Sequence, residues 1–166
     1  MKLDIDLTKQ EDVMYGKCAV TPDFPTAKPV MNHALSLIRI KLMRDEYIGK
    51  GLITDVMIKN VSSSLIMNIL DGDIWIQEGK SDIPIGGGYM LNDDNPAVSE
   101  AILPPLYHPD GVSLSFKLDG KEMSYTFPSW HEWEAGNIYT YTIKIKGAYN
   151  LSLIHISEPT RLRCIS

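Results

Sequence analysis

Residues 133–146 read W-E-A-G-N-I-Y-T-Y-T-I-K-I-K, and this stretch decides the fold class of the chain. From Ile138 onward apolar and polar side chains alternate, so that one face carries Tyr139, Tyr141, Ile143 and Ile145. A period of two in β-branched and aromatic residues is typical of a half-buried strand. Gly136 and Asn137, just before it, tolerate the positive φ that a tight turn requires. The stretch therefore predicts a turn and then a strand, for which the rest of the chain must supply partners.

Two further long segments have the composition of strands. In residues 33–43 apolar and basic side chains alternate from Ile38 to Leu42. Leu35 and Leu37 fall on the opposite parity, so we expect either a bulge or burial of both faces near the start of this strand, with a helix as the weaker alternative. Residues 52–61 predict a second strand, and we expect its inward face to carry Thr54, Val56 and Ile58.

Paired short segments predict hairpins. Apolar runs at residues 65–70 and 74–77 flank Asp71-Gly72-Asp73, a spacing typical of a hairpin or a corner. Asp119-Gly120 is a hairpin signal between two alternating segments. We expect the inward side chains of that hairpin to be Leu114, Phe116, Leu118, Met123, Tyr125 and Phe127.

The remaining segments are less regular. Residues 101–105 end in two prolines, which predicts a strand at the edge or end of a sheet. Residues 1–30 are poorly patterned, and residues 78–95 are polar and glycine-rich, so we expect them to form an exposed excursion. About seven short strands with turns between them predict an all-β, transthyretin-like or Greek-key β-sandwich. The most buried side chains should include Ile38, Ile40, Phe116, Tyr141 and Ile143.

Composition excludes some functions. The chain has 166 residues with 44% hydrophobic and 22% charged, which is enough for one domain with a real core. Its net charge is −5 and no basic stripe is present, so a nucleic-acid partner is not expected.

The sequence carries no catalytic, metal or cofactor signature. Gly86-Gly87-Gly88 is not followed by the Lys and Ser/Thr of a phosphate loop, and Asp71-Gly72-Asp73 lacks the other ligands of a calcium loop. His33, His108 and His131 are far apart and have no second ligand at metal spacing. We therefore expect no enzyme, no cofactor and no metal. Three tryptophans, Trp75, Trp130 and Trp133, are candidates to stack on glycans or partners, or to plug the core instead.

The last sixteen residues differ from the rest. Residues 151–161, L-S-L-I-H-I-S-E-P-T-R, closely resemble the conceptual translation of a transposase sequencing adapter. We therefore divide the chain into a domain at residues 1–150 and a non-native, adapter-derived tail at residues 151–166, which we expect to be dispensable. Of the two cysteines, Cys164 falls in this tail, which leaves Cys18 as a lone thiol.

Three motifs in order carry a family resemblance. They are D-V-M-Y at residues 12–15, H-A-L-S-L-I-R-I-K-L at residues 33–42, and W-E-A-G-N-I-Y-T-Y-T-I at residues 133–143. Together they resemble the N-terminal domain of fimbrillin-like proteins, the type V pilus subunits and surface lipoproteins of Bacteroidetes. The resemblance spans residues 12–146.

The resemblance implies a role and a place. It implies a structural, tip or anchor subunit of cell-surface fimbriae, held to the outer membrane by a lipid anchor and assembled with other pilus subunits by donor-strand exchange. A cell-surface glycan-binding lipoprotein module, with host or microbial glycans or proteins as partners, is the alternative. No signal peptide or lipid-bearing cysteine is present, so we expect a fragment that is truncated at its N-terminus. We also expect an open apolar groove beside residues 139–145 or 33–43.

Overall fold

The computed structural model describes residues 1–147 and 150–161, the last of these by their backbone. One short 3-10 helix, η1 (Leu7–Lys9), accompanies the strands. In chain order the strands are β1 (Lys2–Asp6), β2 (Met14–Lys17), β3 (Val30–His33), β4 (Ser36–Asp45), β5 (Leu52–Val61), β6 (Ser64–Asn68), β7 (Ile74–Ile76), β8 (Ser81–Gly86), β9 (Tyr89–Met90), β10 (Ala97–Leu103), β11 (Ser113–Leu118), β12 (Lys121–Thr126), β13 (Asn137–Lys146) and β14 (Asn150–Arg161).

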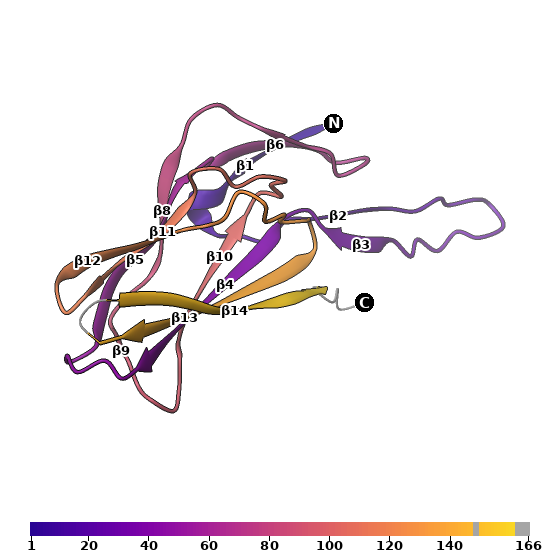
Figure 1. Ribbon diagram of the computed structural model, residues 1–166. Helices are drawn as coiled ribbons and strands as arrows, with labels where there is room; N and C mark the ends of the chain where they lie inside the picture. The colour runs from indigo at the N-terminus through magenta and orange to yellow at the C-terminus, as the bar shows by residue number, and fades with distance from the viewer. Residues whose placement is uncertain (148–149, 162–166) are drawn as a thin grey trace.

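Two sheets enclose the core. One has the strand order β10-β4-β13-β14 and the other β12-β11-β5-β8, with β9 added to β5 (Figure 1). The buried side chains of both sheets form one hydrophobic cluster. A three-stranded sheet, β1-β6-β7, and a two-stranded sheet, β2-β3, lie beside this pair. The predicted all-β sandwich is confirmed, although the expected seven strands become fourteen because many are too short to show a pattern.

The predicted core strand lies at the centre of its sheet. β13 runs parallel to β4, with Ile138 opposite Leu37 and Lys146 opposite Asp45. Tyr139, Tyr141, Ile143 and Ile145 are all buried, as the alternation predicts. The other residues expected among the most buried, Ile38, Ile40 and Phe116, have no exposed area. Leu35 is also buried ahead of β4, so side chains of both parities are buried near the start of that strand.

The predicted inward face of β5 is wrong at Thr54. Ile53 is buried in its place, whereas Val56 and Ile58 are buried as predicted. The reason is a bulge at Asp55, which has φ 51° and shifts the side-chain parity by one residue. A left-handed residue inside a strand leaves no trace in a simple alternation pattern.

The irregular segments contain strands that the sequence did not predict. Residues 81–86 form β8 against β5, and Ile83 is fully buried, so residues 78–95 are not an exposed excursion. Residues 2–6 form β1 against β6. The predicted hairpins at β6–β7 and β11–β12 are confirmed, as is the edge position of the strand before the double proline, β10.

The groove expected beside β4 or β13 is not open along the part of the chain that the structure describes. β4 lies between β10 and β13, and β13 lies between β4 and β14. Residues 150–161, which include most of the tail expected to be dispensable, form the strand that covers β13. Residues 162–166 lie outside the described residues.

Candidate subunit-binding edge

The candidate site is the edge of β13 that lies opposite its β4 edge. On one edge β13 pairs with β4 without interruption from Ile138 to Lys146. On the other edge it pairs antiparallel with β14, from Asn137 opposite Arg161 to Lys146 opposite Asn150. This second register shifts twice, between Ile138 and Thr140 and between Thr142 and Ile143. β13 therefore has one regular, internal edge and one edge covered less regularly by the last described strand.

A buried hydrogen-bond chain fixes β13 in place. The indole Nε1 of Trp133 donates to the hydroxyl of Tyr141 over 2.8 Å, and that hydroxyl lies 3.0 Å from Nδ1 of His131. Because indole only donates, the Tyr141 hydroxyl accepts from Trp133. The direction of its bond with Nδ1 of His131 is set by the imidazole tautomer. The loop before β13 is thereby tied to the middle of the strand.

Burial shifts the pKa of both titratable groups in this hydrogen-bond chain, Tyr141 and His131. It raises the pKa of Tyr141 to about 12, so the phenol stays protonated as the hydrogen bonds require. It lowers the pKa of His131, because a charged imidazole would be desolvated there. The ring of Phe127 packs edge-on against Trp133 at 5.3 Å and against Tyr141 at 4.9 Å. Aromatic packing and hydrogen bonds thus hold the same strand, β13, in place.

Polar contacts hold the two ends of β13. The backbone N–H of Glu134 donates to the Tyr139 hydroxyl, and the N–H of Gly136 donates to the carbonyl of Leu35. At the other end Asp45 lies 3.7 Å from the ammonium of Lys144 and 3.3 Å from that of Lys146. Both ends are therefore anchored on the β4 side, and none of these contacts depends on β14.

The three candidate tryptophans are separated by burial. Trp133 is 1% exposed and belongs to the core, so it forms no surface contact with a glycan or partner. Trp130 is 71% exposed and its ring lies edge-on to His131 at 4.0 Å. Trp75 is 47% exposed on β7, and the ammonium of Lys2 lies 5.5 Å from its ring centroid. Trp75 and Trp130 stay candidates, on different elements.

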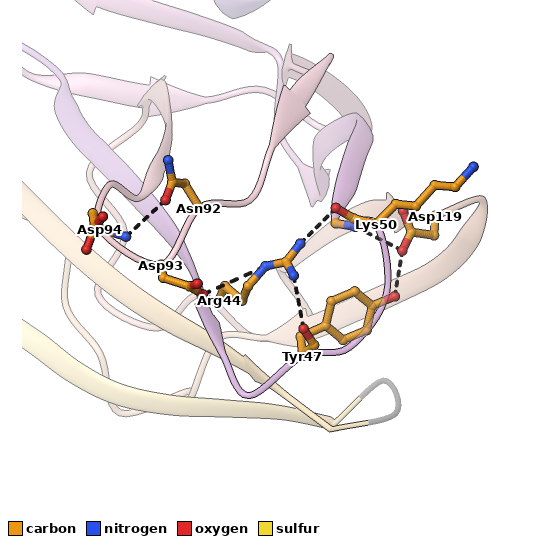
Figure 2. A network of polar contacts seen from close by, with 8 residues as sticks. Arg44, Tyr47, Lys50, Asn92, Asp93, Asp94 and Asp119 are labelled. Carbon is orange, nitrogen blue, oxygen red and sulfur yellow. Dashed lines mark hydrogen bonds and ion pairs between the residues drawn. The ribbon is translucent and has the colours of Figure 1, made fainter.

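A polar clip that sequence reasoning missed joins two turns. The carboxylate of Asp119 accepts from the N–H groups of Gly51 and Leu52 and from the hydroxyl of Tyr47 (Figure 2). Arg44 donates to the carbonyls of Tyr47 and Lys50, and its Nε lies 3.9 Å from Asp93. The Asp-Gly pair signalled a turn, but nothing in it indicated that the aspartate would bind the β4–β5 turn.

Asp119→Asn should remove stability at neutral pH and alter its acid dependence. Hydrogen bonds to its carboxylate hold the pKa of Asp119 below the ordinary value of 3.8. The largest contribution comes from the N–H of Gly51, followed by the N–H of Leu52 and the hydroxyl of Tyr47. A depressed carboxyl pKa contributes stability that is complete above about 3.8 and is lost as pH falls through the folded-state pKa. Asparagine tolerates the left-handed φ of 49° at this position. In thermal melts, the gap between wild type and variant should be constant above about pH 5 and close below pH 3.8. A pH-independent gap would contradict this account.

The surface of residues 1–147 carries open hollows and no metal-ligand cluster. Three of these hollows measure about 160, 240 and 250 Å³. No three His, Cys, Asp or Glu side chains within residues 1–147 are grouped to hold a metal ion. Two of the histidines there have separate neighbours: His33 contacts Asp12 at 2.6 Å, and His108 contacts the carbonyl of Ser129 at 3.0 Å. No helix in the described chain is long and apolar enough to cross a membrane.

Solved structures share this fold. The chain resembles a candidate cell adhesion protein from Bacteroides uniformis, with TM-score 0.76 and 20% identity, over 98% of this chain and 66% of that one. It resembles a second, from Bacteroides ovatus, with TM-score 0.63 and 15% identity, over 95% and 59%. It resembles a third, from Bacteroides fragilis, with TM-score 0.54 and 16% identity, over 83% of this chain and 48% of that one. The chain thus spans between about half and two thirds of the length of these structures.

The family follows from the sequence match. No curated protein matches the chain. The family model described as fimbrillin-like matches residues 5–158, which include the three motifs and every strand from β2 to β13. The match also extends into residues 151–158, part of the segment expected to be adapter-derived. The match covers most of the sequence, and the chain belongs to the fimbrillin-like family.

Proposed function

We propose that this chain is a non-enzymatic structural or adhesive subunit of bacterial cell-surface fimbriae, in which the second edge of β13 accepts a strand from a neighbouring subunit. Membership of the fimbrillin-like family supports the pilus and adhesion role. The pairing of β13 is the observation that carries the strand-accepting role. Its edge toward β4 is fully paired without β14, and its other edge is covered by residues 150–161. The proposal includes export to the outer membrane surface on a lipid anchor, as the family resemblance implies.

The chemistry of this edge suits strand addition. Main-chain N–H and C=O groups of a strand edge supply affinity to an added strand, and alternate side-chain positions supply specificity. β13 is ten residues long and carries a continuous apolar face toward the core. Its anchors, the Trp133–Tyr141–His131 chain and the Asp45 ion pairs, lie within the sandwich or on the β4 side. The edge of β13 therefore keeps its backbone geometry when another strand replaces β14.

A chain ending at Gly147 tests the proposal. This variant keeps all of β13 and removes β14. Its melting temperature should rise with the concentration of a free peptide of residues 150–161, because a ligand bound only by the folded state stabilises that state by mass action. A strand peptide from a second fimbrial subunit should do the same. The matched control is each peptide with prolines at two alternate positions, which removes the N–H groups that would pair with β13. A melting temperature indifferent to all peptides would refute the strand-accepting role.

The same truncation tests the origin of the tail. If residues 151–166 are non-native, the shortened chain should keep the unfolding free energy of the full chain within about 1 kcal/mol, the size of a typical point-mutant effect. Chemical denaturation of the two chains side by side measures the difference. A larger loss would identify residues 150–161 as a native strand of this domain and leave β13 a permanently internal strand.

Glycan binding is the second candidate function, and the exposed ring of Trp130 favours it. Aromatic faces at a surface stack on apolar faces of sugar rings, and this ring is largely free of cover. Loss of glycan-array binding on Trp130→Ala, with binding retained in Ile48→Ala, would support the glycan-binding module. Ile48 is a matched control because it is an exposed apolar residue in another turn.

A further inference from the structure

The arm formed by β2, β3 and residues 18–29 between them exposes several apolar side chains. Figure 1 shows it extending away from the sheets. Every residue from 17 to 32 is exposed, including Phe24 at 77% and Val30 at 74%. Val20 and Met31 are exposed as well. A two-stranded ribbon is marginally stable in water, and contiguous exposed apolar side chains mark interaction sites.

The base of the arm is fixed, whereas its far end has no support from the sheets. At the base, Ala34 donates to the carbonyl of Val13, and His33 contacts Asp12. The ring of Tyr15 packs so closely on Gly72 of the β6–β7 turn that a Cβ at Gly72 would overlap it. Beyond the pair formed by Lys17 and Val30 the chain makes only a tight turn between Thr21 and Phe24. The arm is thus held out in a defined direction.

A complementary surface lies beside the base of this same arm. β7 is an edge strand that pairs only with β6 among the described strands, and it exposes Trp75 and Ile76. A hollow of about 240 Å³ is lined by residues of both the arm base and the β6–β7 turn, among them Tyr15, Val30 and Leu70. Leu70 and Trp75 make this surface, which we call the β7 edge, the apolar counterpart of the arm. Ile76 points to the opposite face of β7 and lines another hollow.

The charges of the two surfaces are opposite. The exposed part of the arm carries Lys17 and Lys28 against one acidic residue, Asp23. The segment of residues 71–80 carries the exposed acids Asp71, Asp73 and Glu78 against Lys80, and Lys2 adds one positive charge beside Trp75, so the acids remain in excess. The molecule therefore presents both halves of one contact, and a two-fold axis would satisfy both at once and close the assembly.

We propose that the arm is a self-association element: in a dimer of this chain, the arm of each copy lies along the β7 edge of the other, with Phe24 seated in the hollow beside the partner's arm base. The contact uses surfaces separate from β13, so it adds a lateral contact to any strand exchange. It gives a second route by which copies of a fimbrillin-like chain meet, independent of a donor strand.

Sedimentation velocity of the full chain over a concentration series tests the proposal. We expect a reversible monomer–dimer equilibrium. Phe24→Asp should raise the dimer dissociation constant at least tenfold, because it places a charge in an apolar contact. Trp75→Asp on the β7 edge should have a similar effect. Ile48→Asp, at an apolar residue that is 90% exposed in the β4–β5 turn, should leave the constant unchanged.

Charge reversal and mixing test the pairing itself. Lys28→Glu and Asp73→Lys should each weaken the dimer, and the double variant should recover most of the loss. Phe24→Asp and Trp75→Asp chains should associate with each other more strongly than either does with itself, since one intact arm then meets one intact edge. Restoration in both experiments is expected, and additive losses would overturn the proposed pairing.

Crosslinking locates the contact. Copies carrying Cys18, with Cys164→Ser, are mixed with copies carrying Cys18→Ser, Cys164→Ser and Gln77→Cys, and a short bis-maleimide is added. A mixed crosslinked dimer is expected with Gln77→Cys and not with Ser124→Cys, an exposed position on β12. A chain that stays monomeric throughout, or a dimer indifferent to Phe24→Asp and Trp75→Asp, would overturn the proposal. A dimer lost on truncation after Gly147 but kept in Phe24→Asp would instead identify strand exchange.

Discussion

Ile143→Ala should lower the free energy of unfolding by about 2–5 kcal/mol, the usual range for truncating a buried isoleucine. Ile143 has no exposed area, and it lies on β13 between two paired strands. The loss combines the transfer free energy of the removed carbons with the cavity they leave. Urea denaturation, with the slope m checked for constancy, measures it.

Thr142→Ala is the matched control for Ile143→Ala. Thr142 is the preceding residue on the same strand, with its side chain on the opposite, partly exposed face. Its replacement should therefore cost well under the lower figure for Ile143. Equal losses would mean that both faces of β13 are buried to the same degree, contrary to the observed alternation.

Trp133→Ala should cost about 3–5 kcal/mol, because it removes the largest fully buried side chain and breaks the hydrogen-bond chain to β13. The Tyr141 hydroxyl would lose its donor, and Phe127 would lose an edge-on ring contact. Trp130→Ala, three residues away and largely exposed, should change stability by no more than about 0.5 kcal/mol. The two melts, compared at one pH, test the division of the tryptophans into core and surface. A severe loss from Trp130→Ala would contradict it.

The alternation in β13 predicted its buried face correctly because a strand with one face in a core must repeat every second residue. The same logic failed in β5, where the left-handed Asp55 moves the parity so that Ile53 replaces Thr54. It also failed for β8, because Ile83 sits in a polar, glycine-rich context that reads as a loop. A local sequence pattern indicates only the period of the side chains within one segment. Whether that segment contains a bulge, or forms a short buried strand, depends on residues distant in the chain that pack against it.

The candidate site was predictable only in part. The closing strand was evident from residues 133–143, and the family from that motif together with the two motifs upstream. The parallel pairing of β13 with β4, in contrast, depends on tertiary structure. Trp133 could not be separated from Trp130 by sequence, since both flank the same turn and only packing distinguishes them. The Asp119 clip was equally hidden, because its partners, Tyr47, Gly51 and Leu52, lie in a different turn.

The parallel pair at the centre of the sandwich also determines the order in which the protein can fold. More than half of the chain separates the end of β4 from the start of β13. Closing so long a loop is slow, and it must precede the contacts that reward it. A chain emerging from the ribosome or an export channel therefore presents one edge of β4 without its partner β13 until residue 146 has appeared. During that interval the open strand edge favours pairing with other chains, so the domain depends on whatever keeps nascent copies apart until its closing strand arrives.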